Sequence, residues 1–175
     1  MSAADRTTRA DTTIVTVDKG NDTLAWLRTR TSLDVVPIRH PVIEALGHAP
    51  TSDYAFLWLP MVGPATLWTH RLLTAGFTAN PEGYRVDLAT LSRELSLGAG
   101  TGRHSAVART VSRLVRSDLA DIVDDRLGLS TTLPPLTPRH AARLPAHLAA
   151  RHRQLAQQHQ TRRPRSAGIT AEARW

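Results

Sequence analysis

Four arginines and no acidic residue occur in the segment 103–117. They are Arg103, Arg109, Arg113 and Arg116. A guanidinium group stays charged throughout the physiological pH range, and its planar fork matches two oxygens of a phosphate or the O6 and N7 atoms of guanine. Serine and threonine in the same segment add short hydrogen-bonding groups. These residue types at this spacing indicate binding of a polyanion.

The same segment has the periodicity of an amphipathic helix. With about 100° between successive residues, Val107, Val111 and Leu114 fall on one side, which we expect to be buried. No glutamate stands three or four positions from the arginines to balance their charge. The opposite side, which we expect to be exposed, holds Ser105, Arg109, Ser112, Arg113 and Arg116.

Residues that coordinate metals or hold nucleotides are not spaced for that chemistry. The chain has no cysteine, and the glycine-rich segment 98–102 lacks the Lys-[Ser/Thr] of a P-loop. Two pairs of histidines in the C-terminal segment have members seven residues apart, which is roughly 10 Å along a helix axis and too far to share an ion. These pairs are His140 with His147, and His152 with His159.

No combination of nucleophile, base and acid stands out in the sequence. Asp124 and Asp125 are adjacent and would point to opposite faces of a strand. His104 and Ser105 are neighbours without a third residue or a nucleophile-elbow motif. We therefore predict a protein that is not an enzyme and needs neither a cofactor nor a metal.

The excess positive charge lies in the C-terminal part of the chain. The formal net charge is +7, and residues 103–175 contain thirteen basic residues against five acidic ones. A one-sided excess of this kind is typical of proteins that bind a polyanion. Lys19 is the single lysine, so a GC-rich genome, which favours arginine codons, also explains part of the arginine content. Because no stretch has the length of a membrane span, we expect a soluble, cytoplasmic protein.

Two short helices are predicted ahead of residue 80. Ser52 and Asp53 suit the N-cap of the first, and Pro60 is expected to end it. Pro64 suits the first position of the second, which Gly76 closes. Tryptophans in apolar segments are expected in the core, and these are Trp26, Trp58 and Trp68.

The next elements lead into the arginine segment and out of it. A short strand over 84–86 is followed by Asp87, a good N-cap for a helix with leucines at every third or fourth position. A glycine-rich link joins that helix to the arginine helix, 105–117. Two β-runs, over 120–124 and 127–133, then predict a hairpin around a turn at 125–128.

The order of the elements predicted between residues 52 and 133 resembles a winged helix-turn-helix domain of the transcriptional-regulator type. The resemblance rests on Asp87-Leu-Ala-Thr-Leu-Ser-Arg-Glu-Leu95 as the first helix of the motif and on the helix that starts at Ser105 as the second. It implies a mainly α fold with a small β-hairpin, in which the second helix enters the major groove of duplex DNA. The DNA-binding residues that it implies are Arg103, Ser105, Arg109, Thr110, Ser112, Arg113, Arg116 and Arg126.

The predicted organisation places this domain between an N-terminal appendage and a basic C-terminal helix. The appendage is expected to hold a strand near 13–17, a helix near 22–30 and a surface connector over 35–50 with a helical turn near 42–46. The predicted segments are a disordered lead over 1–12, the appendage over 13–50, the winged-helix domain over 51–136, the basic helix over 137–160 and a disordered tail over 161–175.

Arginines in the C-terminal helix are predicted to make auxiliary phosphate contacts. They are Arg139, Arg143, Arg151 and Arg153. The hairpin, which would be the wing, contains one arginine among acids, and such a wing contributes little to phosphate binding or faces a protein instead. The acids are Asp118, Asp121, Asp124 and Asp125.

The expected partner is duplex DNA, bound by a homodimer because one motif of this size rarely gives enough specificity. Two alternatives stay open. The first is an adaptor whose winged helix binds an acidic component of the transcription or replication machinery. The second is a replication initiator or another nucleic-acid-handling factor of a mobile element.

Overall fold

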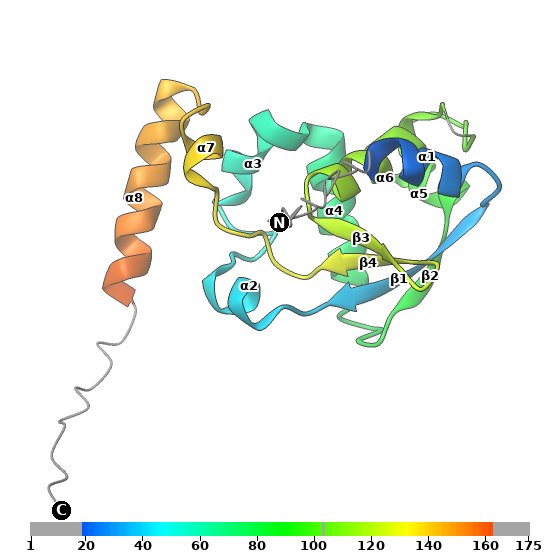
Figure 1. The fold of residues 1–175 in the computed structure, drawn as a ribbon, viewed down its shortest axis with the longest axis horizontal. Coiled ribbons are helices and arrows are strands. Elements are labelled where there is room, and N and C mark those ends of the chain that lie inside the picture. The colour runs from blue at the N-terminus through cyan, green and yellow to red at the C-terminus, as the bar shows by residue number, and fades with distance from the viewer. Residues whose placement is uncertain (1–18, 103, 163–175) are drawn as a thin grey trace, which may run out of the picture.

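The computed structural model describes residues 19–102 and 104–162 and has a mixed α/β fold (Figure 1). The predicted lead over 1–12, the predicted strand over 13–17, Arg103 and residues 163–175 of the predicted tail lie outside the described residues. The first two residues of that tail, 161 and 162, are helical, so the prediction of disorder is wrong for them. The helices of the described part are α1 Lys19–Leu27, α2 Pro41–Leu46, α3 Ala55–Val62, α4 Pro64–Gly76, α5 Leu88–Glu94, α6 Ala106–Arg116, α7 Pro138–Ala141 and α8 Ala146–Arg162.

Four strands form one mixed sheet with the order β2-β1-β4-β3. β1 is antiparallel to β2, parallel to β4, and lies between them, while β3 and β4 form an antiparallel hairpin. The predicted hairpin is therefore present, but the expectation of a mainly α fold is wrong because the hairpin is half of a larger sheet. The strands are β1 Ser32–Ile38, β2 Tyr84–Asp87, β3 Ala120–Val123 and β4 Arg126–Ser130.

β1 extends into the segment from residue 35 that the sequence predicts to be a surface connector. Leu33 and Val35 are buried on it, and Asp34 between them is partly exposed. Pro37 suggested a loop, because a proline is rarely found in a central strand. β1 pairs with β2 as far as Val35 and with β4 from there on, so Pro37 occupies a part of the strand that has a neighbour on one side. The predicted helical turn after it is confirmed as α2.

The hairpin turn lies earlier than predicted. Asp124 and Asp125 both have positive φ, 49° and 63°, as the two central residues of a type I′ turn require. The prediction placed the turn at 125–128, but Gly128 is buried inside β4. A β-carbon at Gly128 would lie 2.5 Å from Cδ1 of Ile38 on β1, so the glycine leaves room for the Ile38 side chain in its present position.

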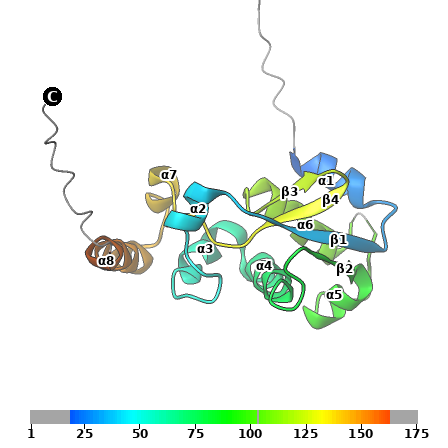
Figure 2. The same cartoon turned by 90° about the horizontal axis from the view of Figure 1, so that it is seen from below.

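Helices α4 and α5 lie on one side of the sheet (Figure 2). The predicted N-cap of α5 is confirmed, since Oδ1 of Asp87 accepts a hydrogen bond of 2.7 Å from the backbone N–H of Thr90. Apolar side chains of these elements join a single cluster with the sheet and α6. Its fully buried leucines are Leu27, Leu33, Leu57, Leu73, Leu88, Leu91, Leu114, Leu119, Leu127, Leu129 and Leu133.

Helix α3 differs from the prediction at both ends. It begins at Ala55, and Tyr54 rather than Ser52 or Asp53 occupies the N-cap position, without a side-chain cap. Pro60 lies inside the helix, which continues to Val62. A proline removes one helical hydrogen bond, and burial of three residues of α3 offsets that loss because the helix packs on the core. The predicted start of α4 at Pro64 is confirmed.

The predicted C-terminal helix is confirmed as two pieces, α7 and α8, separated around Pro145. α8 lies at one end of the molecule, far from the β3–β4 hairpin in both views (Figures 1 and 2). It contacts α3, and Nη2 of Arg151 pairs with Oδ2 of Asp53 at 2.5 Å. The ring of His152 also lies against that of Tyr54, with centroids 6.3 Å apart.

Candidate nucleic-acid interface

Helix α6 presents three arginines on one exposed strip of its surface. Arg109, Arg113 and Arg116 are exposed, and with about 100° per residue they fall within an arc of about 60°. Of the eleven residues of α6, seven are buried. The exposed residues of this helix therefore carry three positive charges and no negative one. We refer to Arg109, Arg113 and Arg116 together as the arginine strip.

Two predicted contact residues of α6 are not on its exposed surface. Thr110 is 6% exposed and Ser112 is 5% exposed, so the prediction that Ser112 lies on the exposed side of the helix is wrong, while DNA contact by these two residues stays a prediction. Oγ1 of Thr110 donates a hydrogen bond of 2.8 Å to the carbonyl oxygen of Ala106, one turn earlier. The physical reason is that α6 packs against α1 as well as against α4 and α5. A helical projection that assumes one buried side cannot show that a second helix covers another side.

The two ends of α6 are held by local hydrogen bonds. Oγ of Ser105 accepts from the N–H of Ala108 at 3.2 Å, which confirms the predicted start of the helix. At the other end Asp118 adopts a positive φ of 54°, and the N–H of Leu119 donates to the carbonyl of Leu114 at 3.1 Å. This is the pattern of a Schellman motif, usually formed by glycine. Ser105 is thus a cap first, and its partly buried side chain is already engaged.

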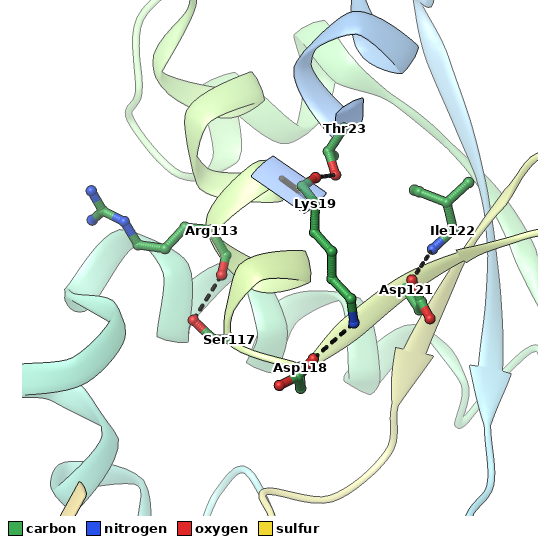
Figure 3. Close-up of polar contacts among 7 residues, drawn as sticks. All are labelled: Lys19, Thr23, Arg113, Ser117, Asp118, Asp121 and Ile122. Atoms are coloured by element: carbon green, nitrogen blue, oxygen red, sulfur yellow. Dashed lines mark hydrogen bonds and ion pairs between the residues drawn. The ribbon is translucent and has the colours of Figure 1, made fainter. Parts of the chain in front are cut away.

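Arg113 is oriented by the junction between α3 and α4. Its Nη1 donates a hydrogen bond of 3.3 Å to the carbonyl oxygen of Val62. Figure 3 shows its side chain extending away from Lys19 of α1. Gly63 allows this approach, since a β-carbon there would lie 3.3 Å from the same nitrogen. The guanidinium keeps other N–H groups for a ligand, but its position along the strip is set by α3.

Two acids near the hairpin, one before β3 and one in the turn, bind α1 and the segment that follows it. Asp118 accepts from Nζ of Lys19 at 3.1 Å (Figure 3). Asp125 accepts from Nε1 of Trp26 at 2.8 Å and pairs with Nη2 of Arg30. The hydrogen bonds from Arg30 and Trp26 lower the pKa of the Asp125 carboxyl. The negative charge that argued against phosphate binding by the hairpin is therefore partly neutralised from within the chain.

The remaining predicted residues are exposed but spread over several elements. Arg126 lies at the start of β4, 3.8 Å from the carboxylate of Asp124. Arg151 pairs with Asp53, so its charge is also shared. The other auxiliary candidates are exposed on α7, just after it, and on α8, and they are Arg139, Arg143 and Arg153. Sequence reasoning did not identify Lys19, Trp26 and Arg30, because their roles depend on where α1 packs.

His70 is buried in α4, away from the exposed strip. Its Nε2 donates to the carbonyl oxygen of Ser130 at 2.8 Å, so the neutral ring carries its proton on Nε2. Within the described residues Nδ1 has no partner, although it too is buried. Burial lowers the pKa of His70 to about 4. The side chain is thus a neutral link between α4 and the end of β4.

Apolar side chains are exposed on α3 and α4. Phe56 and Trp68 are each 58% exposed and Leu72 is 37% exposed, so the prediction that Trp68 belongs to the core is wrong. Trp68 stands between two hollows of about 200 Å³ and 600 Å³, one shared with Phe56 and the other with Leu72. Trp58, by contrast, is buried as predicted, and Trp26 is partly buried. We refer to Phe56, Trp68 and Leu72 as the aromatic surface.

The described residues offer neither a metal site nor a membrane span. No group of three or more His, Asp or Glu side chains in 19–102 and 104–162 is placed to hold a metal ion. In the same ranges no helix has both the length and the apolar character needed to cross a membrane. Comparison of the chain with protein-family models, with curated proteins and with solved structures finds no match. The function is therefore inferred from geometry and charge.

Proposed function

We propose that the chain is a winged-helix protein that binds duplex DNA as a sequence-specific transcriptional regulator. α4, β2, α5, α6 and the β3–β4 hairpin follow one another in the order of that domain. In this proposal α6 is the helix that enters the major groove and the hairpin is the wing. β1 is an added strand between β2 and β4, and α1 is an added helix against α6.

The arginine strip is the observation that carries the proposal. The three guanidinium groups lie within an arc of about 60° around the helix axis, so all three can face the DNA when α6 lies in the major groove. The exposed residues of α6 include no acid that would repel the phosphates. Arg109 lies nearest the N-terminal end, the part of such a helix that contacts base edges. A paired contact from arginine to guanine contributes about 1–3 kcal/mol of discrimination between bases.

The location and the stoichiometry follow from the same proposal. A regulator works where the chromosome lies, so we place this protein in the cytoplasm in association with the nucleoid. One strip contacts few base pairs, and specific sites are usually read by two copies about one helical turn of DNA apart. We therefore expect a homodimer on the specific site.

Fluorescence anisotropy of a labelled random-sequence duplex, measured over a series of salt concentrations, tests the proposal. The variants are Arg109→Ala and, as a matched control, Arg39→Ala, which removes one charge from an exposed residue just after β1. The affinity falls as the salt concentration rises, and each lost phosphate contact makes the slope of log K against log salt less steep by about 0.9. We expect Arg109→Ala to lower the slope or the affinity, and Arg39→Ala to behave as wild type.

Two results would refute DNA binding by the strip. One is the absence of binding at low salt, and the other is an Arg109→Ala variant that binds with the same affinity and slope as Arg39→Ala. If binding is confirmed, a genome-wide map of occupied sites separates a regulator, expected at promoters, from a replication initiator, expected at origins.

A second candidate function, protein interaction by an adaptor, is favoured by the aromatic surface. Exposed contiguous aromatic and aliphatic groups are more typical of interfaces than of monomer surfaces. Arg71 lies over the ring of Trp68, 5.0 Å from its centroid, so an acidic partner would meet both an apolar anchor and a positive charge. Trp68→Ser should abolish capture of such a partner and leave DNA affinity unchanged. Loss of DNA binding in Trp68→Ser would count against two independent surfaces.

A further inference from the structure

A hollow of about 350 Å³ lies where the C-terminal end of α6 meets α3 and α7. Its apolar wall belongs to α3 and includes Trp58, Pro60 and Met61. Arg116 lines it from α6, and Arg143 lines it from the residues after α7. These two arginines are twenty-seven positions apart in the sequence, and the packing of α7 on α3 brings them to one cavity.

The position of Arg143 depends on contacts between α7 and α3. The ring of His140, on α7, meets the buried ring of Trp58 edge to face, with centroids 6.3 Å apart. Nε1 of Trp58 donates to the carbonyl oxygen of Pro134 at 3.3 Å and so ties the segment before α7 to α3 as well. Arg143 lies two residues beyond this anchored helix, and its exposed side chain lines the hollow.

The hollow has an excess of positive charge. The acid on its wall is Asp118, and its carboxylate already accepts a hydrogen bond from Lys19 (Figure 3). Two arginines and one aspartate therefore line the hollow, and the charge of that aspartate is offset by Lys19 from outside it. Within the described residues neither Arg116 nor Arg143 forms an ion pair with an acid. Two unpaired guanidiniums lining one cavity favour an anion between them.

We propose that this hollow binds a phosphate group between Arg116 and Arg143, and that the group belongs to the backbone of the bound duplex. The inference rests on the proposed function, because it needs α6 to lie against DNA. Arg116 is seven residues beyond Arg109, about 10 Å along the helix at 1.5 Å per residue. The major groove is about 12 Å wide, so a helix with Arg109 at the bases brings Arg116 near the strand that borders the groove.

The same chemistry has a second source, a free phosphate monoester. A hollow with two arginines and an apolar wall would hold either ligand, since both present the oxygens that a guanidinium fork matches. The two sources differ in what the hollow contributes to DNA binding. A backbone phosphate makes Arg143 part of the salt dependence of duplex binding, whereas a free monoester does not.

The first arm of the test measures the salt slope of duplex binding for Arg143→Ala and Arg143→Lys. The Arg39→Ala variant again controls for the loss of one charge. We expect the salt dependence of Arg143→Ala to be less steep than that of the control by about 0.9, since the steepness follows the number of phosphates neutralised. Arg143→Lys keeps a positive charge and should retain most of the wild-type steepness. Arg143 is exposed, so neither variant should unfold the protein.

The second arm uses inorganic phosphate without DNA. Trp58 lines the hollow, and its indole N–H donates to the carbonyl of Pro134. The NMR resonance of this N–H should shift as phosphate is added to the wild type and stay fixed in Arg143→Ala. A shift here with an unchanged duplex slope supports a phosphate site whose ligand is a free monoester. No shift and no slope change overturns the proposal, even if Arg109 proves essential for DNA binding. If the duplex does not bind at all, the proposed function fails, and this second arm alone decides whether the hollow binds phosphate.

Discussion

Replacement of His70 by glutamine should remove a large part of the pH dependence of stability. The side chain is fully buried, and burial lowers its pKa from 6.5 to about 4. In the unfolded chain the imidazole regains its ordinary pKa of about 6.5. Between these two pH values the unfolded state binds more protons than the folded state, so stability falls as the pH falls. Glutamine keeps an N–H donor for the carbonyl of Ser130 but does not titrate.

The size of the effect follows from the shift. Each pKa unit corresponds to 1.36 kcal/mol, so a pKa lowered from 6.5 to about 4 predicts a loss of about 3 kcal/mol between pH 7 and pH 4. The stabilisation is complete above pH 6.5 and declines from there towards pH 4. Other titrating groups, such as the carboxyls of Asp34 and Asp125, whose pKa values are lowered, contribute equally to the stability of wild type and variant. Their contributions cancel in the difference.

Urea unfolding of both proteins at pH 7, 6, 5 and 4 measures this difference. We expect the free energy of unfolding of wild type to fall relative to His70→Gln by about 3 kcal/mol across the series. Parallel curves for the two proteins would refute the assignment of a neutral buried imidazole. If the variant does not fold, the NMR titration of the His70 ring in wild type still decides, because a midpoint near 6.5 in the folded protein contradicts the reasoning.

Three further predictions concern the elements around α6. Gly128→Ala should cost about 1–3 kcal/mol of stability by overpacking, because the new methyl group meets Ile38; a second change, Ile38→Ala, should restore part of the loss in thermal unfolding, and no restoration would argue against that contact. Ser105→Ala should cost about 1 kcal/mol, while Ser105→Asp keeps an N-cap oxygen and should unfold at the wild-type temperature; equal losses in both would exclude capping. Asp125→Ala removes the acceptor of Trp26 and Arg30, so amide hydrogen exchange should become faster in α1 and stay unchanged in α5. Exchange in α1 at the wild-type rate would show that Asp125 does not hold α1.

Local signals in the sequence predicted where α4, α5 and α6 begin. Asp87 caps α5 as predicted, and Ser105, predicted as the start of the next helix, is the N-cap of α6. An N-cap needs a short side-chain oxygen and the next three residues of backbone, all of which are adjacent in the chain. The strip of Arg109, Arg113 and Arg116 was predicted for the same reason, because the α-helical period converts spacing directly into direction. These features depend on interactions within about one or two turns.

Predictions failed where distant segments meet. β1 enters the sheet between β2 and β4, and nothing in residues 32–38 states which strands will flank them. Thr110 and Ser112 are buried because α1 packs on α6 in addition to α4 and α5. Trp68 is exposed although its neighbours are apolar, since burial depends on what covers a helix and not on the helix itself.

The amino-acid sequence by itself determined where the charge lies, which residues begin the helices around the arginine strip, and that a hairpin follows. These properties arise from short-range backbone hydrogen bonds and from helical periodicity. Tertiary structure decided that Lys19 of α1 pairs with Asp118 before β3, that Arg30 after α1 pairs with Asp125 in the hairpin turn, and that Arg116 and Arg143 line one hollow. The reason is physical, because a pairing between residues far apart in the chain depends on which surfaces come together when the core closes, and no local pattern encodes that choice.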